Sequence, residues 1–316
     1  MTVQIEANQS WAVMESKFVG CMLGCALGDA LGSRYEGLSI DDITSVDMGF
    51  VGRWTDDTHM MIGVAESLIE CRGFNGEHMV WTFIRNWQRE PWRGYGPGPP
   101  RVFRMILSGV PWFEAAKRLY GGSGSLGNGG AMRVAPIALL YYDDYEKLRE
   151  VAYRSAMLTH AHELGMEGAV VQAYAIVLAL RANASFSPRD YLEEVARFSK
   201  SDVYRNKLKK AIELLDEGDQ KIVVRELGNG VEAPNSVPTA IYCFAKNYYS
   251  YVKTVLYAVT LGGDADTIAA MAGAIAGAYH GEEGLPREWV ERLEKAEYIK
   301  KLARELWTLR RSLKVS

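Results

Sequence analysis

Apolar and polar positions recur along most of the chain at the three- and four-residue spacing of α-helices. Gly73 and Pro91 end two of these segments, and Pro111 and Pro188 suit first helical turns. We find no convincing alternating strand and no internal repeat. The pattern predicts helices over about residues 16–32, 56–71, 76–89, 111–119, 131–142, 144–158, 164–182, 188–199, 202–216, 236–247, 250–261, 265–279 and 287–313. The predicted fold class is therefore all-α.

The chain of 316 residues is predicted to form one domain, since no shift in composition marks a boundary. Its hydrophobic content of 48% is enough for one large core or two small ones. Residues 1–14 carry no strong pattern and are expected to form a loose N-terminal arm.

Two predicted helices carry small residues at every fourth position. The first has Gly20, Gly24 and Gly28, and the second has the stripe Ala269, Gly273 and Gly277. Glycine weakens a helix interior by about 1 kcal/mol, so its repetition indicates a compensating close contact between backbones. We expect the two stripes to pack against each other.

Charge and composition exclude several classes of protein. The formal net charge is −3 and no basic stretch is present, so an extended nucleic-acid ligand is not expected. No signal peptide is evident, and charged residues interrupt the apolar runs, so no membrane span is expected. The four cysteines show no zinc-type spacing and suit a reducing, cytoplasmic location.

Two acidic clusters each open an apolar segment. Residues 55–58 read Thr-Asp-Asp-Thr, and residues 262–267 read Gly-Gly-Asp-Ala-Asp-Thr. Asp264 alone could simply cap a helix. Adjacent carboxylates such as Asp56 and Asp57 repel each other unless a cation or proton lies between them. Together the clusters supply enough oxygen ligands for a pair of divalent ions, Mg²⁺ or Mn²⁺ rather than zinc.

Two glycine-rich segments, residues 93–100 and 121–130, could be connectors or binding loops. The second contains Ser125 and Asn128 and leads into a predicted helix, where exposed backbone N–H groups favour phosphate. Tyr120 could stack on a base or pack in the core. His160 and His162 are two residues apart, a spacing that argues against a joint metal site and leaves a substrate contact or a structural role.

Four motifs resemble those of the ADP-ribosylglycohydrolase family. They are residues 28–32 (Gly-Asp-Ala-Leu-Gly), 55–58, 127–133 (Gly-Asn-Gly-Gly-Ala-Met-Arg) and 262–267, and the resemblance spans roughly residues 18 to 290. It implies a compact, orthogonal multi-helix bundle with a centre of two Mg²⁺ or Mn²⁺ ions. It also implies cleavage of the bond between an acceptor and C1″ of ADP-ribose.

One branch of that family is more similar, the hydrolases of ADP-ribosylserine, poly(ADP-ribose) and O-acetyl-ADP-ribose. The matching stretches are residues 35–36, 93–96, 124–128, 236–244 and 271–279. The resemblance implies metal ligands at Thr55, Asp56, Asp57, Asp264, Asp266 and Thr267. It implies binding of the diphosphate and riboses by Gly94, Ser125, Gly127, Asn128 and His160. Tyr120 and Leu126 would flank the adenine, with a weaker stacking face at Leu126, where many members have an aromatic residue.

The same resemblance implies that the metals hold the ribose hydroxyls and activate a water. The expected transition state has oxocarbenium character. Glu36 would lie on a mobile flap that gates the site. The carboxylate that accepts the proton of water is Asp56, Asp57 or Glu36, and the sequence does not rank them.

Two other functions use the same residues. A non-catalytic, crystallin-like protein would be expected to lose ligand carboxylates, and this chain keeps them. A two-metal phosphatase is disfavoured by the order of the motifs. The expected partners are ADP-ribosylated proteins or ADP-ribose derivatives, and the expected state is a monomer. Whether the acceptor is serine, arginine, an acetyl group or a polymer is left open.

Overall fold

The computed structural model describes residues 2–47, 50, 52–183 and 185–313, with side chains from Trp11 onward. Its regular structure is helical, and the described residues form no strand, only an isolated antiparallel bridge between Gly127 and Glu232. The predicted all-α class is confirmed. The first helices are α1 (Thr2–Gly32), α2 (Asp56–Glu70), α3 (Gly76–Arg89), α4 (Gly98–Leu107), α5 (Trp112–Ala115), η1 (Ala116–Gly122), α6 (Gly129–Met132), α7 (Ala135–Leu140) and α8 (Tyr145–Met157).

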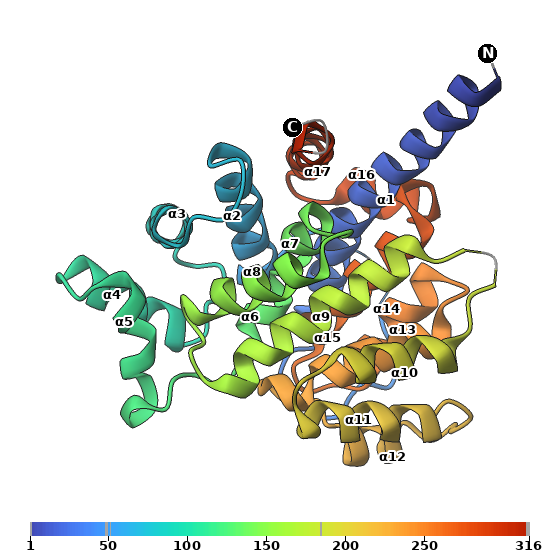
Figure 1. Cartoon of the computed structure of the whole chain (residues 1–316). Coiled ribbons are helices and arrows are strands. Elements are labelled where there is room, and N and C mark those ends of the chain that lie inside the picture. Colours follow the sequence, from blue (N-terminus) through green and yellow to red (C-terminus); the bar gives the residue numbers. More distant parts are fainter. Residues whose placement is uncertain (1, 48–49, 51, 184, 314–316) are drawn as a thin grey trace.

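The second half of the chain completes the bundle (Figure 1). Its helices are α9 (Glu163–Arg181), α10 (Pro188–Phe198), α11 (Asp202–Glu213), α12 (Gln220–Leu227), η2 (Ala233–Asn235), α13 (Val237–Asn247), α14 (Tyr251–Thr260), α15 (Ala265–His280), η3 (Glu282–Gly284), α16 (Arg287–Arg292) and α17 (Ala296–Leu313). Side-chain caps fix several starts, for example Asn75 for α3 and Ser187 for α10.

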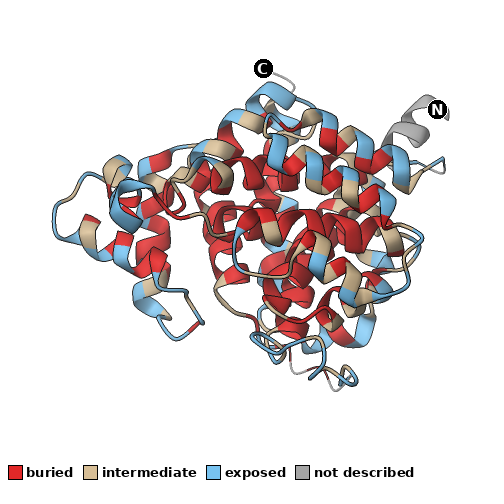
Figure 2. Ribbon diagram, turned by 90° about the horizontal axis from the view of Figure 1, so that it is seen from below, coloured by how far each residue is buried: buried red, intermediate tan, exposed pale blue. Residues whose placement is uncertain are grey.

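The core is built around α1, α9 and α15, in which nearly all inner residues are buried. Figure 2 shows the buried residues concentrated in the middle of the bundle. The two stripes of small residues pack as expected. A Cβ added at Gly24 would lie 2.4 Å from the Gly273 carbonyl oxygen, and one at Gly28 would lie 2.1 Å from that of Ala269. No larger side chain fits either position, so the stripes hold α1 and α15 at backbone contact.

Helix α9 corrects one expectation about apolar runs. By length and composition alone it could cross a membrane. However, 83% of its apolar window is buried inside the bundle, which is the environment of a central core helix.

Other boundaries also differ from the sequence prediction. The expected arm is helical, since α1 begins at Thr2, and its first turns project from the bundle (Figure 1). Helices α4 and α12 were missed; α4 has two prolines in its first turn, and Asp219 caps α12. The helix predicted at 131–142 is divided into α6 and α7. The one at 111–119 gives way to η1, where Tyr120 adopts a left-handed conformation.

The helix predicted at 287–313 is broken into α16 and α17 by contacts from a remote loop. Lys295 at the break has a φ of 55°. The Trp54 indole donates to the carbonyl of Glu294 at 2.8 Å, and the Glu294 N–H donates to the Gly52 carbonyl at 2.9 Å. These tertiary hydrogen bonds replace the helical ones that the local sequence favours.

Candidate active site

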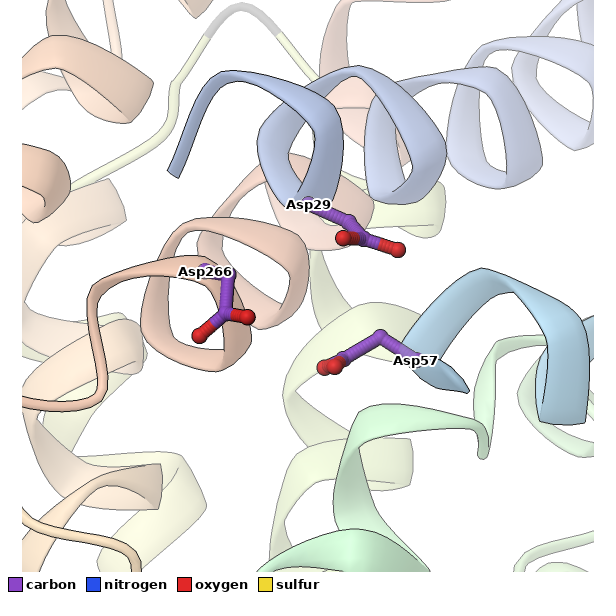
Figure 3. A group of neighbouring side chains, drawn as sticks. All are labelled: Asp29, Asp57 and Asp266. Carbon is purple, nitrogen blue, oxygen red and sulfur yellow. The ribbon is translucent and has the colours of Figure 1, made fainter. Parts of the chain in front are cut away.

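Three helix ends bring the acidic residues together. Asp29 lies in the last turns of α1, Asp57 in the first turn of α2, and Asp266 in the first turn of α15. Figure 3 shows the three carboxylates directed toward one space. The close packing of α1 on α15 reaches this point, because a Cβ at Gly32 would lie 2.4 Å from the Asp266 Cα. The small-residue stripes therefore set the distance between two of the carboxylates.

A cavity of about 240 Å³ has an acidic end formed by the carboxylates of Glu36, Asp56, Asp57, Asp264 and Asp266. It is lined by all the predicted site residues except two, namely by Glu36, Asp56, Asp57, Gly94, Tyr120, Ser125, Gly127, Asn128, His160, Asp264, Asp266 and Thr267. The exceptions are Thr55 and Leu126, which are half-buried and lie outside the lining. Residues 96–99, Gly129, Met132 and Val231 also line the cavity and were not predicted.

Asp29 is a site residue that the sequence analysis did not assign. Its buried carboxylate accepts hydrogen bonds from the backbone N–H of Thr55 and of Thr58, both at 3.0 Å. It also accepts from their hydroxyls at 2.9 and 2.6 Å. Asp29 thus ties the start of α2 to the end of α1. Its sequence signal was an ionisable residue within an otherwise apolar helix.

The acidic end has no cationic side chain in its lining. Burial, followed by the charge of Asp29, raises the pKa of Asp56 to about 8 and places the pKa of Asp57 well above its usual range. Burial and the neighbouring Asp264 do the same to Asp266. Asp57 Oδ1 is buried and has no hydrogen-bond partner within the described residues. Carboxylates in this state require protons or cations.

The arrangement of oxygen atoms fits hard divalent cations. One ligand oxygen each from Asp29, Asp57 and Asp266 lie within 4.8 Å of one another, and so do those from Glu36, Asp264 and Asp266. Oxygen-only donor sets of this kind suit Mg²⁺, Mn²⁺ or Ca²⁺ rather than zinc. Asp266 belongs to both groups, so adjacent cations could share it.

The two threonines have different positions. Thr55 caps α2, and its hydroxyl contacts Asp29 Oδ1 at 2.9 Å and Asp57 Oδ2 at 3.1 Å, without lining the cavity. The Thr267 hydroxyl lines the cavity and lies 3.5 Å from Asp57 Oδ2.

Glu36 reaches the cavity from the loop that follows α1. Its side chain is exposed, and partial burial together with Asp264 raises its pKa. Reciprocal backbone hydrogen bonds hold this loop to the turn before α15: Gly37 N–H donates to the Gly263 carbonyl and Gly263 N–H donates to the Leu38 carbonyl, both at 2.8 Å. Arg34, on the same loop, forms an ion pair with Asp47 at 3.3 Å.

The other end of the cavity consists of neutral donors and backbone. Asn128 Nδ2 donates to Asp264 Oδ2 at 2.5 Å and to the Ser236 hydroxyl at 3.0 Å, which links the two ends. Gly94 has a φ of 86°, a conformation that favours glycine, and lies beside Asp56. Tyr120 stands at the cavity with its side chain 56% exposed, so its ring is available to a ligand.

His160 and His162 do not share a site. The His162 ring accepts a hydrogen bond from Leu164 N–H and caps α9. The His160 ring is buried and lines the cavity. The expectation that they form no joint metal site agrees with these positions.

The fold and cavity define an all-helical protein with an acidic, oxygen-rich centre next to a neutral binding loop. Residues 10–314 match the sequence model of the ADP-ribosylglycohydrolase family. The chain belongs to this family and is an ADP-ribosyl hydrolase. It is 39% identical to ADP-ribosylhydrolase ARH3 of Bos taurus, covering 92% of both chains. It is 38% identical to that of Homo sapiens, covering 92% of this chain and 93% of the relative.

The fold of a solved structure supports the same family assignment. The chain superposes on an "ADP-ribosylglycohydrolase-related protein complex" with a TM-score of 0.76 and 31% identity, over 94% of this chain and 98% of that one. The family resemblance and the helical bundle expected from the sequence are confirmed.

Proposed function

We propose that this protein is a divalent-cation-dependent hydrolase that removes ADP-ribose from modified proteins or small acceptors by cleaving the linkage at C1″. Serine-linked, O-acetyl and polymeric ADP-ribose are favoured over the arginine-linked form, because the chain is similar to curated ADP-ribosylhydrolases ARH3 and because the motif stretches resemble that branch. The observation that carries the proposal is the cavity itself, with unpaired carboxylates at one end and neutral donors at the other.

The carboxylates would hold two ions, Mg²⁺ or Mn²⁺. Asp29, Asp57 and Asp266 are suited to one, and Glu36, Asp264 and Asp266 to the other. Such ions, when bound, supply Lewis acidity that makes water a stronger nucleophile near neutral pH.

The chain's own residues would orient the substrate and move the proton. Ser125 and His160 offer donors to the diphosphate and riboses, Asn128 lines the cavity with its amide held by Asp264 and Ser236, and Tyr120 offers a ring to the adenine. Asp56, Asp57 and Glu36 all line the cavity, so any of these carboxylates, once bound cations have displaced its proton, could accept the proton of the attacking water. The four cysteines are free thiols, which supports the expected cytoplasmic location.

Release of ADP-ribose tests the reaction. Purified protein is incubated with an ADP-ribosylserine peptide, an ADP-ribosylarginine peptide and O-acetyl-ADP-ribose, each with Mg²⁺, with Mn²⁺ and with a chelator. We expect metal-dependent release from the serine or acetyl substrate. Failure on every substrate with both metals would contradict the proposal and favour a binding protein.

Product binding tests the orientation of the ligand. ADP-ribose with Mg²⁺ should stabilise the fold by RT ln(1 + [L]/Kd), about 2.7 kcal/mol at a hundredfold excess over Kd. AMP should raise the melting temperature less, because it lacks the distal ribose. Equal shifts would mean that the carboxylate end does not contact that ribose.

A further inference from the structure

Arg133 is a cation in the core with no carboxylate beside it. Its side chain is fully buried and forms no ion pair within the described part of the chain. Nη2 donates to the Ser155 carbonyl and Nη1 to Thr159 Oγ1, both at 2.8 Å. A guanidinium can only donate hydrogen bonds, so the Thr159 hydroxyl is the acceptor in this contact.

The Thr159 hydroxyl also contacts His160, with 2.7 Å between Oγ1 and Nδ1. Thr159 is fully buried, and a buried hydroxyl hydrogen is nearly always donated to an acceptor. Among the described residues, Nδ1 is the acceptor within reach. Nδ1 of His160 therefore carries no hydrogen, and the hydrogen of the neutral ring is on Nε2.

The Nε2 edge of His160 is left open by glycines. A Cβ added at Gly129 would lie 2.7 Å from Nε2, and one at Gly127 would lie 3.3 Å away. Both glycines line the cavity, as the ring does. Within the described residues Nε2 has no hydrogen-bond partner, although the side chain is only 6% exposed. A donor that lines the cavity without a protein partner is suited to a ligand atom.

We propose that Arg133 and Thr159 are positioning residues that hold His160 in its neutral Nε2–H tautomer, so that the ring presents a fixed hydrogen-bond donor to the ligand. The identity of that ligand rests on the proposed function. ADP-ribose offers oxygen acceptors on its diphosphate and riboses, which a neutral N–H can bind without a proton being transferred. His160 is then a binding donor and neither an acid nor a base in the reaction.

The electrostatic environment agrees with a neutral ring. Burial, and then the positive charge of Arg133, lower the pKa of His160 to about 3. The pKa of Arg133 is also lowered by burial, to about 9, so the guanidinium is still charged at neutral pH. The cation thus acts twice: it opposes protonation of the ring, and through Thr159 it selects the tautomer.

The tautomer can be observed in the free protein. In a nitrogen–proton correlation spectrum of protein labelled with ¹⁵N-histidine, His160 Nδ1 should give the resonance of an unprotonated nitrogen and Nε2 that of a protonated one. His160→Gln assigns the signals among the five histidines. A proton on Nδ1 would overturn the proposal. This measurement needs no ligand, so it establishes the tautomer of His160 even if the protein binds no ADP-ribose. Failure to bind ADP-ribose would instead contradict the proposed function.

Two substitutions of Thr159 test the positioning role. Thr159→Val removes the hydroxyl at nearly constant shape, while Thr159→Ser keeps it. We expect Thr159→Val to change the Nδ1 and Nε2 resonances and to weaken ADP-ribose binding about tenfold. Thr159→Ser should retain the tautomer and bind within about threefold of the parent. Unchanged resonances and affinity in Thr159→Val would contradict the proposal. If Thr159→Val does not fold, the proposal is tested by Thr159→Ser alone, and loss of the Nε2–H tautomer in that variant would contradict it.

Discussion

Two groups of charged residues flank the segment that leads into α2, and they differ in how their charges are balanced. The first group lies against the Trp54 ring. In it, the carboxylates of Glu90 and Glu294 form ion pairs with the side chains of Arg93 and Lys295. Arg93 forms a two-bond contact with Glu294, 2.7 Å for each bond, and Lys295 Nζ lies 2.7 Å from Glu90. The second group consists of the carboxylates around Asp57. Among the described residues that line the cavity, no Lys or Arg side chain balances their charge.

The pKa values express this difference. Burial alone would raise the pKa of Glu90, but hydrogen bonds from Lys295 and Arg93 outweigh it and lower that pKa to about 2. For Asp57 burial and the charge of Asp29 act in the same direction, and its pKa is raised. The chain balances its own charges in the group around Arg93. It leaves them unbalanced where a cation from solution is expected to bind.

The largest expected effect comes from the unbalanced group. Asp56→Asn/Asp57→Asn and Asp266→Asn should each abolish tight binding of Mg²⁺ and lower the hydrolysis rate at least about a thousandfold, roughly 4 kcal/mol of lost stabilisation. The fold should survive, because like-charge repulsion is relieved. Calorimetric titration with Mg²⁺ measures the affinity, and Glu90→Gln from the balanced group is the control. Unchanged affinity in both acidic-group variants would rule out a site shared by the two clusters.

Glu36 is the exposed member of the unbalanced group, and its removal should separate binding from turnover. We expect Glu36→Ala to retain ADP-ribose binding and to lose about a hundredfold in single-turnover rate at saturating metal, through lost proton transfer or closure. Arg34→Ala is the matched control, since Arg34 is paired with Asp47 on the same loop. A rate within a few-fold of the parent would limit Glu36 to a structural role.

Breaking the balanced group should affect stability more than chemistry. Arg93 also donates to the Trp54 carbonyl at 3.2 Å and its guanidinium carbon lies 3.8 Å from the centre of the Trp54 ring. Arg93→Met should destabilise the fold by about 2 kcal/mol, less than for a fully buried pair because Glu294 is partly exposed. Urea unfolding measures this loss. Arg93→Met/Glu294→Met should recover part of it, and no recovery would show that the ion pair is not the source.

The smallest effect, measured over a single pH unit, is a pH dependence of the metal-free protein. The pKa of Asp56 is raised to about 8 from an unfolded value of 3.8, so between these values the folded state binds more protons than the unfolded state. Stability therefore falls as pH rises through this window, by at most about 1.4 kcal/mol per pH unit for one proton. With a chelator present, Asp56→Asn should gain in melting temperature relative to the parent as pH increases. A pH-independent difference would contradict the raised pKa.

Sequence alone determined the features that depend on neighbours along the chain. Helical periodicity predicted α2, α3, α9 and α15 to within a few residues, and the glycine spacing predicted the contact of α1 with α15. The two acidic clusters were visible because each opens a helix, where capping and ligation use the same residue types.

Only the tertiary structure decided which remote groups meet. Asp29 was not assigned because its partners, Thr55 and Thr58, are on another helix. The division of the last predicted helix depends on Trp54, and the tautomer of His160 depends on the burial of Arg133. Periodicity and capping are local properties of the chain. Contacts between distant residues are set by how whole helices pack, and that packing is fixed by the complete set of buried surfaces rather than by any single segment.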